Sequence, residues 1–378
     1  MRVLICPDKF AGTCSAVQVA AEIAAGWREA APADSVATRP LSDGGPGFLD
    51  VLEAAVGGRR LAVPTVDPLG RPVTGSVLVV DDSADGQRAA YVESADACGL
   101  HLVAPEDRDP KSATSYGLGT LVAAAVETGV RRVVIGLGGS ATNDAGAGML
   151  AALGAAPLDA AGYALPYGGA ALLGCASLGG TPRLRDVTLV AATDVDNPLV
   201  GPHGASAVYG PQKGASREDV VLLDSALERF ADVLERELPT CPPQLADLPG
   251  GGAAGGLGAA VLALGGRCES GIGLVRAVTG LDEALDAADL VITGEGSFDH
   301  QSLRGKVVAG VAAAARERGL PCVVVAGRVT AGREEAAAAG VTEAHSLVEH
   351  FGSVAAAMSQ TAEGLRALGA RLAARWSR

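Results

Sequence analysis

The stretch Val133-Val-Ile-Gly-Leu-Gly-Gly-Ser-Ala-Thr-Asn-Asp-Ala-Gly-Ala-Gly148 shows how this chain folds. A short β-branched run leads into closely spaced glycines, then into hydroxyl, amide and carboxylate side chains, and then into a helical pattern. A continuous apolar run that ends at glycine is typical of a strand buried in a parallel sheet. A strand that passes through a glycine-rich loop into a helix is the repeating unit of α/β folds.

The same order of strand and helix recurs on both sides of this stretch, which predicts an α/β fold with a parallel sheet. Strands are predicted at Val3–Cys6, Leu61–Val66, Val73–Val80, Ala89–Glu93, Arg132–Leu137, Val187–Ala192, Leu290–Thr293 and Cys322–Ala326. Helices are predicted from Ser15, which opens a capping box with Gln18, to about Ala31, and at Glu218–Leu238, Leu303–Arg318 and Ser353–Arg375.

The middle of the chain differs from its ends. Residues 61–93 give several strands with turn signals and no helix between them, which predicts a mixed sheet, and regular strand-helix alternation resumes near residue 285. We therefore predict two α/β domains, the second inserted into the first. The first is a discontinuous three-layer domain of the flavodoxin or Rossmann type, residues 1–70 and 285–378; the second is a mixed α/β domain, residues 71–284.

Composition excludes several classes of function. The net charge of −13 and the pI of about 4.9 argue against nucleic acid or an anionic membrane as a partner. The chain has no apolar run of about 18 residues, which a transmembrane helix would need. Its seven cysteines are scattered, odd in number and without a CxxC pair, which favours reduced thiols in a cytoplasmic protein. The five histidines show no zinc-site spacing.

Glycine is abundant, 52 of 378 residues, and it gathers in loops that follow apolar runs, where ligands bind in open α/β sheets. The first such loop, Pro7–Ser15, combines Lys9 with the start of a helix and so suits an anion; a surface lysine in a capped loop is the alternative. The second, Ser42–Gly47, places Asp43 beside glycines, where it can approach a metal or a hydroxyl; an aspartate in a tight turn is the alternative.

The third loop follows the strand quoted first, and its backbone N–H groups could bind phosphate. It also mimics a dinucleotide-binding pattern, but no acidic strand end follows about 20 residues later. The fourth loop, Ala192–Leu199, holds Asp194 and Asp196, which suit a hydrated divalent cation or a catalytic base. It also resembles the DxD motif of haloacid-dehalogenase phosphatases.

The fifth loop, within Leu290–Lys306, brings Gly, Glu, Ser and Asp out of a buried strand, a density of functional groups that is costly for stability alone. A Walker A motif is absent, because Gly305-Lys306 is followed by Val307. The protein-kinase motifs, a GxSxG elbow and HExxH are absent too. Any phosphate chemistry must therefore use another arrangement.

Together the five loops resemble those of the bacterial two-domain glycerate kinases, over essentially the whole chain. The family motif GLGGSATNDGGAGM matches residues 136–149 with one change, Ala145, and ITGEGxxDxQSxxGK matches residues 292–306. The sequence departs from the family at Ala11, where lysine is usual, and at Pro46 and Phe48, which replace Glu and Thr of a DGGEGT motif.

The resemblance implies ATP-dependent phosphorylation of D-glycerate, usually at the 2-hydroxyl, giving 2-phosphoglycerate; 3-phosphoglycerate stays open as the product. It implies ATP and Mg²⁺ as cofactors, and a site in the cleft between a flavodoxin-like domain and a second α/β domain. It fits a cytoplasmic enzyme and allows a homodimer.

Phosphoryl transfer needs positioning, charge neutralisation and a group that orients the hydroxyl, and on this basis we assign roles to the matching residues. Asp194 is the expected base, and Lys9 and Lys306 are expected to neutralise phosphate or the glycerate carboxylate. For the substrate we expect Asp8, Asp43, Gly44, Gly45, Ser297, Asp299 and Gln301. For the nucleotide we expect Gly138, Gly139, Ser140, Thr142, Asn143, Gly255, Gly256 and Glu295. For Mg²⁺ we expect Asp196 and Asp43.

Alternative functions stay open at this point. The changed loop at Pro46 and Phe48 could belong to a kinase of another small hydroxy acid. A sensor that binds a sugar acid without turnover is a second alternative, and a nicotinamide-dependent oxidoreductase and a DxD phosphatase are the others.

Overall fold

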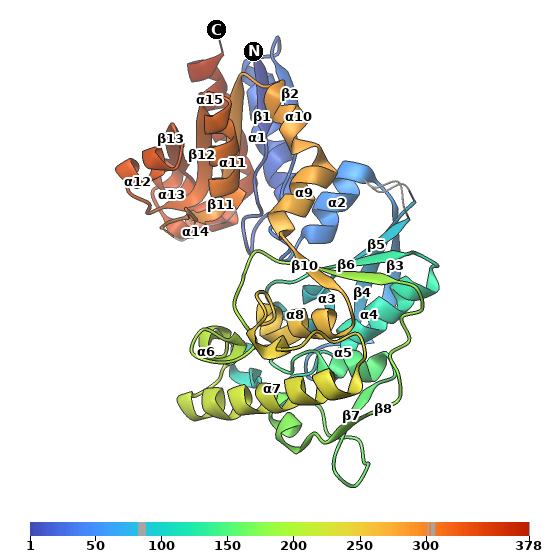
Figure 1. Cartoon of the computed structure of the whole chain (residues 1–378). Helices are drawn as coiled ribbons and strands as arrows, with labels where there is room; N and C mark the ends of the chain where they lie inside the picture. The colour runs from blue at the N-terminus through green and yellow to red at the C-terminus, as the bar shows by residue number, and fades with distance from the viewer. Residues whose placement is uncertain (82–87, 301, 304–306, 378) are drawn as a thin grey trace. The chain divides into compact units, whose positions relative to one another are not determined.

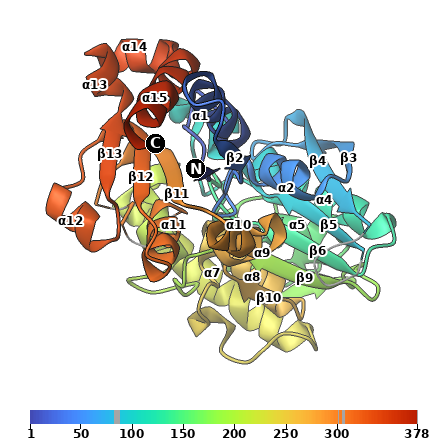
Figure 2. The ribbon, with the colours of Figure 1, turned by 90° about the horizontal axis from the view of Figure 1, so that it is seen from above.

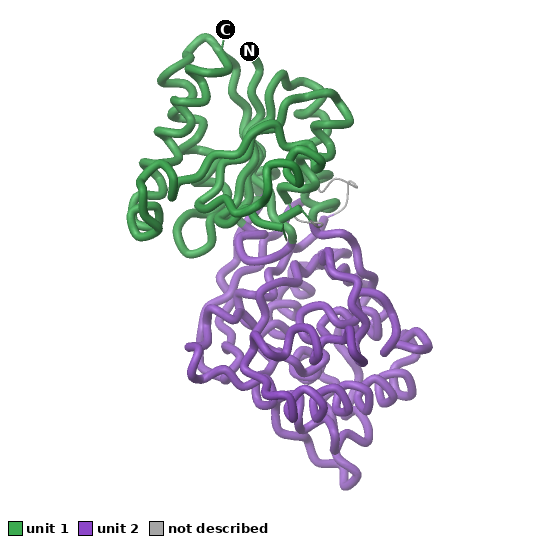
Figure 3. The backbone as a smooth tube through the Cα atoms, turned by 90° about the vertical axis from the view of Figure 1, so that its left-hand side faces the viewer, with its two compact units in different colours: residues 1–43, 50–57, 272–378 green, residues 44–49, 58–271 purple. Residues whose placement is uncertain are grey.

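The computed structural model describes residues 1–81, 88–300, 302–303 and 307–377 (Figure 1). Two compact units emerge from the contacts along the backbone, and Figure 3 colours them separately. Unit 1 comprises residues 1–43, 50–57 and 272–378, and unit 2 comprises residues 44–49 and 58–271. The predicted domain ranges differ from this division at residues 44–49, 58–70 and 272–284. Residues 58–70 fall in unit 2 because strand β3 (Arg59–Val66) pairs along its length with strand β4 (Pro72–Val80).

Unit 1 is built on a five-stranded parallel sheet in the order β13-β12-β11-β1-β2. Its strands are β1 (Arg2–Ile5), β2 (Ser35–Thr38), β11 (Leu290–Phe298), β12 (Cys322–Val329) and β13 (Glu343–Ser346). Strand β1 lies inside the sheet between β11 and β2, and its residues Val3, Leu4 and Ile5 are all buried, as expected for a strand covered on both faces.

Helices cover both faces of this sheet, and Figure 2 shows α1 and α15 side by side on one face and α10 and α11 on the other. The helices are α1 (Ala16–Ala30), most of α2 (Phe48–Val56), α9 (Gly271–Thr279), α10 (Leu281–Asp286), α11 (Val307–Glu317), α12 (Arg333–Ala338), α13 (Leu347–Phe351), α14 (Val354–Ser359) and α15 (Thr361–Trp376). Ile23 and Trp27 of α1 pack with Leu365 and Leu372 of α15 in one apolar core.

Unit 2 contains a mixed six-stranded sheet in the order β10-β9-β6-β5-β4-β3. Strands β5 (Ala89–Glu93), β6 (Arg132–Gly136), β9 (Thr188–Ala192) and β10 (Arg267–Glu269) are parallel, and β3 and β4 continue the sheet as antiparallel strands. A separate antiparallel pair is formed by β7 (Ala156–Leu158) and β8 (Ser177–Gly179).

The helices of unit 2 and the sheet bury one aliphatic core, to which Leu118, Met149, Leu227, Phe230 and Leu257 contribute. The helices are α3 (Ala95–Cys98), α4 (Tyr116–Glu127), α5 (Ala147–Ala152), α6 (Ala205–Tyr209), α7 (Arg217–Glu237) and α8 (Ala253–Ala263). Short 3-10 helices lie at Leu100–Leu102, Pro105–Asp107, Gly169–Gly174, Pro211–Lys213 and Leu245–Asp247.

The predicted α/β fold is confirmed, and so is the run of β3, β4 and β5 without an intervening helix. The capping box of Ser15 and Gln18 also forms as predicted.

Three details of the predicted secondary structure were wrong. The strand predicted to end at Thr293 continues to Phe298, because Glu295, Ser297 and Phe298 still pair with β12. The single helix predicted for residues 353–375 is broken near Gln360 into α14 and α15. The short strands β2, β7, β8, β10 and β13 were missed, since they carry too few consecutive apolar residues to stand out.

None of the helices formed by the described residues combines the length and the hydropathy that a membrane span requires.

The contact between α1 and α15 depends on glycine. A Cβ atom at Gly26 would lie 1.9 Å from the carbonyl oxygen of Arg366, and one at Gly369 would lie 2.3 Å from that of Ile23. We therefore expect Gly26→Ala to force the two helices apart and to lower the free energy of unfolding by about 1–3 kcal/mol. Urea denaturation followed by circular dichroism measures this change.

Gly310 in α11 provides the matched control. It is also a helical glycine, but the nearest atom to an added Cβ is Ile272 Cγ1 at 3.9 Å. Gly310→Ala should therefore raise the stability by roughly 0.5–1 kcal/mol through helix propensity. Equal effects of the two substitutions would contradict the close approach of α1 and α15.

Candidate active site

A pocket opens in unit 1 at the carboxyl ends of β1 and β11. These strands are neighbours in the sheet, but the chain leaves β1 toward β2 on one side and leaves β11 toward β12 on the other. The sheet order therefore changes direction between them, and open α/β sheets bind their ligands at such a point. The first and fifth predicted loops, Pro7–Ser15 and Leu290–Lys306, meet here.

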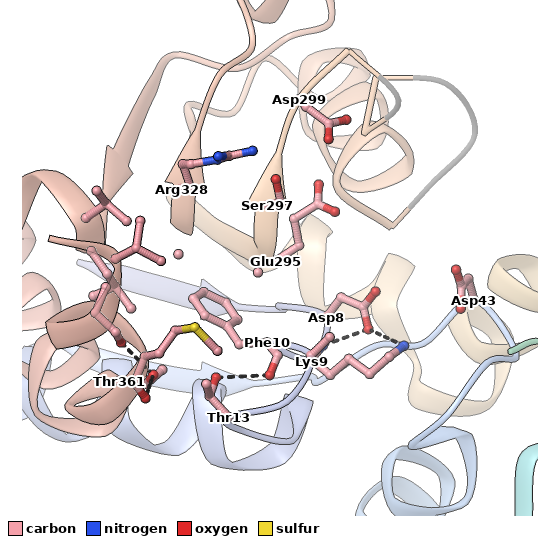
Figure 4. A pocket seen from close by; sticks show the side chains of 18 residues that line it. Asp8, Lys9, Phe10, Thr13, Asp43, Glu295, Ser297, Asp299, Arg328 and Thr361 are labelled. Atoms are coloured by element: carbon pink, nitrogen blue, oxygen red, sulfur yellow. Dashed lines mark hydrogen bonds and ion pairs between the residues drawn. The ribbon is translucent and has the colours of Figure 1, made fainter. Parts of the chain in front are cut away.

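The pocket has a volume of about 500 Å³ and brings together charged side chains from three segments (Figure 4). Asp8 and Lys9 come from the loop after β1, Asp43 from the loop after β2, and Glu295, with Ser297 and Asp299 nearby, from the end of β11. Each of these residues was predicted as a site residue. The predicted residues Gln301 and Lys306 lie outside the described residues.

Hydrogen bonds between the two strand ends hold the pocket's floor. The buried hydroxyl of Thr293 donates to the carbonyl oxygen of Cys6 at 2.9 Å, and the backbone N–H of Asp8 donates to the carbonyl oxygen of Gly294 at 2.8 Å. The loop after β1 is therefore attached directly to β11.

Lys9 has a close acidic neighbour. Its ammonium nitrogen lies 3.7 Å from Oδ1 of Asp8, and the same oxygen accepts a hydrogen bond from the backbone N–H of Lys9 at 2.7 Å. The Lys9 side chain is about one quarter exposed. A cation held in this way can approach an anionic ligand in the pocket.

Three of the predicted loops pack against one another in unit 2 through their backbones. A Cβ atom at Gly44 would lie 2.8 Å from the carbonyl oxygen of Ala192, one at Gly136 would lie 2.6 Å from that of Gly44, and one at Gly138 would lie 2.7 Å from Cα of Gly45. Larger residues could not make these approaches. The predicted glycines at positions 44, 45 and 138 therefore lie together, beside the strand that ends at Ala192.

The predicted glycines at 138 and 139 present backbone donors. No described residue accepts a hydrogen bond from either N–H group, and Gly139 is exposed. Free donors of this kind, two in succession, can bind a phosphate or carboxylate oxygen.

The predicted residues Ser140, Thr142 and Asn143 instead lie in the interior of unit 2. The ammonium of Lys213 donates to Ser140 Oγ at 3.0 Å and to the carbonyl oxygen of Thr142 at 2.7 Å. Nδ2 of Asn143 donates to Ser206 Oγ at 2.9 Å. Lys213 and Ser206 therefore hold the buried side of the loop, through the Ser140 hydroxyl, the Thr142 carbonyl and the Asn143 amide.

Gly255 and Gly256 support the same loop. They lie in the distorted first turn of α8 with φ angles of 74° and 93°, in the left-handed region that favours glycine. A Cβ atom at Gly255 would lie 1.9 Å from the carbonyl oxygen of Thr142, and the carbonyl oxygen of Gly255 accepts a hydrogen bond from the N–H of Ala145. Both glycines are buried.

Asp194 is exposed at the end of β9, and the hydroxyl of Ser270 donates to its Oδ1 at 2.6 Å. Asp196 is exposed two residues later, and the next residue, Asn197, accepts a hydrogen bond from the hydroxyl of Tyr209 at 2.6 Å. Among the described residues, no three His, Cys, Asp or Glu side chains come together as a metal site would need.

Two buried charged residues with evident roles were missed by the sequence analysis. Glu93, at the carboxyl end of β5, is 6% exposed and accepts hydrogen bonds from the backbone N–H groups of Gly47 and Leu49. It thereby holds the loop that carries Pro46. A polar residue directly after an apolar strand was the available signal. Lys213 lay in a glycine-rich segment, but nothing in the sequence showed its burial.

Comparison with known proteins places these sites in a family context. Residues 3–377 match the model of the "Glycerate kinase family". A "Glycerate 2-kinase" from Escherichia coli K12 is 43% identical over 334 residues, which cover 87% of this chain and 86% of the relative. A "Glycerate kinase" from Halalkalibacterium halodurans is 40% identical over 95% of this chain and 93% of the relative. A crystal structure of a Salmonella typhimurium LT2 protein, described as a "putative glycerate kinase 2", matches with a TM-score of 0.82 and 39% identity over 99% of this chain and 98% of that one.

Burial of Lys213 has a consequence for stability. It lowers the pKa of this lysine from 10.5 to about 7, against the opposing influence of Asp144 and Cys98. Between these two pH values the unfolded chain binds more protons than the folded chain, so this group makes the free energy of unfolding rise with pH, by at most ~1.4 kcal/mol per pH unit.

Replacing Lys213 by Met removes this titration. In urea denaturation between pH 7 and pH 10, the wild-type protein should therefore gain stability relative to Lys213→Met as the pH rises. The difference between the two curves reports Lys213 together with its electrostatic coupling to Asp144 and Cys98. A difference that does not change with pH would mean that Lys213 is not buried as a perturbed amine.

Proposed function

Because the chain belongs to the glycerate kinase family, we propose that it transfers the γ-phosphoryl group of ATP to the 2-hydroxyl of D-glycerate and makes 2-phosphoglycerate. The observation that carries the proposal is the pocket at the change of sheet direction, where three of the predicted loops bring Lys9 and four carboxylates together. Transfer to the 2-hydroxyl, as opposed to the 3-hydroxyl, is supported by the name of the Escherichia coli relative.

In the proposed reaction the glycerate hydroxyl oxygen forms a bond to the γ-phosphorus. The bond between that phosphorus and the bridging oxygen breaks, and ADP leaves with the electron pair. The hydroxyl proton passes to the carboxylate of Asp194, which the Ser270 hydroxyl orients through its 2.6 Å hydrogen bond. The Asp194 side chain is exposed at the end of β9, where solvent or a substrate can reach it.

Charge neutralisation is the second requirement of phosphoryl transfer. We assign it to Lys9, whose ammonium can face phosphate oxygens in the pocket, and to the backbone donors of Gly138 and Gly139. Ser140, Thr142, Asn143, Gly255 and Gly256 would act by shaping that loop, because they are buried. For Lys306, which lies outside the described residues, the role of neutralising phosphate or the glycerate carboxylate rests on the sequence alone.

The residues present fit ATP and Mg²⁺. Mg²⁺ retains several water ligands and commonly uses one or two carboxylates together with phosphate oxygens, so a cage of three protein ligands is not required. Asp43 and Asp196 are the proposed carboxylates. When bound with ATP, Mg²⁺ neutralises charge on the phosphates.

A second candidate substrate class is favoured by one residue of the changed loop. Phe48 is fully buried and packs edge-on against Tyr91 with ring centroids 6.3 Å apart, so this change lies in the core of unit 2. Pro46 instead lies near the exposed Gly139. A Cβ atom added at Gly139 would lie 3.2 Å from Cγ of Pro46. A proline beside the proposed anion-binding donors could select another small hydroxy acid.

A cytoplasmic location and a homodimer stay predictions from the sequence.

Purified protein with ATP, Mg²⁺ and D-glycerate should release ADP in a coupled assay, and ³¹P NMR should show 2-phosphoglycerate as the product. A panel of small hydroxy acids in the same assay distinguishes the second candidate. Formation of 3-phosphoglycerate would refute the 2-hydroxyl assignment, and no ADP release with any hydroxy acid would refute the proposal as a whole.

Asp194→Asn should lower kcat by about 10²-fold, because the amide cannot take the proton. The matched control is Asp232→Asn, an exposed carboxylate on α7, which should leave kcat within twofold. Initial rates at saturating ATP and glycerate measure both, with circular dichroism to verify folding. A loss of less than tenfold in a folded Asp194→Asn protein removes the base role from this residue.

A further inference from the structure

We propose that the pocket of unit 1 binds the nucleoside part of ATP, with the purine base against an apolar wall formed by α13, α14 and the start of α15. This deepens the proposed function and rests on it for the identity of the nucleotide. It also differs from the assignment made from the sequence, which placed most nucleotide contacts on the glycine-rich loops of unit 2.

The volume of the pocket suits a nucleotide. About 500 Å³ lies within the range of pockets that bury ligands of several linked rings. Glycerate has only three carbons and would leave most of this space to water. The pocket is also fully lined by unit 1.

One side of the pocket is apolar although it faces solvent. Val354 and Met358 of α14 line it and are 53% and 57% exposed, while Leu347 and Ala357 form a buried layer behind them. Exposed apolar side chains on a pocket wall gain free energy when an apolar ligand covers them. A purine ring offers such a face, and a methionine sulfur makes favourable contacts with aromatic rings.

The other side of the pocket is charged. Arg328, from the end of β12, is exposed, and its guanidinium group makes no hydrogen bond or ion pair with any residue that the structure describes. Figure 4 shows its guanidinium on the side of Ser297 and Asp299. Together with Lys9 it supplies two cations for a polyphosphate, and guanidinium groups bind phosphate oxygens in pairs.

Glycines connect the two sides. Gly296 and Gly327 line the pocket, each next in sequence to a charged lining residue, Glu295 and Arg328. A Cβ atom at Gly327 would lie 2.4 Å from the carbonyl oxygen of Gly296, and one at Gly296 would lie 3.5 Å from Cα of Phe10. The two strands and the loop therefore meet without side chains between them. The part of the pocket lined by these two glycines therefore leaves room for a ribose between the base and the phosphates.

The same features argue against glycerate as the occupant. A small hydroxy acid could pair with Lys9 and Arg328, but it has no surface to cover Val354 and Met358. The pocket has one apolar side, one charged side and two glycines in its lining. These features match a molecule with an aromatic base at one end and phosphates at the other.

The test uses two variants of the full chain. Val354→Asn with Met358→Gln makes the wall polar at exposed positions, and Arg328→Gln removes a cation at the charged end. The polar-wall variant should raise the KM for ATP about tenfold and leave the KM for glycerate within twofold. Val221→Asn on α7, a 68% exposed valine outside the pocket, is the matched control and should change neither constant.

Binding of separate fragments distinguishes the two ends of the pocket. In calorimetry, the polar-wall variant should lose affinity for adenosine about tenfold but keep its affinity for inorganic tripolyphosphate. Arg328→Gln should show the opposite pattern. Because these measurements need no turnover, they judge the nucleoside site even if the wild-type protein fails to phosphorylate glycerate. A rise in the KM for glycerate alone, or unchanged adenosine binding in the polar-wall variant, would overturn the proposal.

Discussion

Parallel pairing between β1 and β11 is the constraint on which the unit 1 site depends. The hydrogen bond from Thr293 to the carbonyl oxygen of Cys6 joins residues 287 positions apart in the chain, and the register pairs Val3 with Leu290. Both strands are buried on both faces, so the pairing is supported by packing as well as by hydrogen bonds. This pairing places Lys9, which follows β1, and Glu295, near the end of β11, in the same pocket. The change of sheet direction between the two strands then opens that pocket at their carboxyl ends.

Unit 2 depends on a different constraint, the close approach of backbones at glycine. Gly44, Gly136 and Gly138 each meet another main chain at distances that a Cβ atom could not tolerate. The same packing leaves the N–H groups of Gly138 and Gly139 without a described partner, while Lys213 holds the loop from its buried side. Glycine therefore serves two purposes in this unit: it permits the close packing of the loops and exposes backbone donors where they can meet an anion.

Much of the candidate site was predictable because strand ends are recognisable. Lys9, Glu295 and Asp299 all follow apolar runs, and parallel strands deliver such residues to one edge of a sheet. Burial was not predictable in the same way. Ser140 and Asn143 have the same chemistry as ligand-binding residues, yet they face the interior, and Glu93 and Lys213 were overlooked although they hold two of the loops. Whether a polar group faces a ligand or a neighbouring loop depends on packing between distant segments.

The amino-acid sequence alone determined the α/β class, most strand positions and the places of the glycine-rich loops, because hydrophobic periodicity and glycine placement are local properties. The motifs at 136–149 and 292–306 also identified the family. Only the tertiary structure decided that the first and fifth loops share a pocket with an apolar wall at Val354 and Met358, and that Phe48 lies in the core. These features arise from contacts between segments far apart in the chain, which local sequence patterns do not encode.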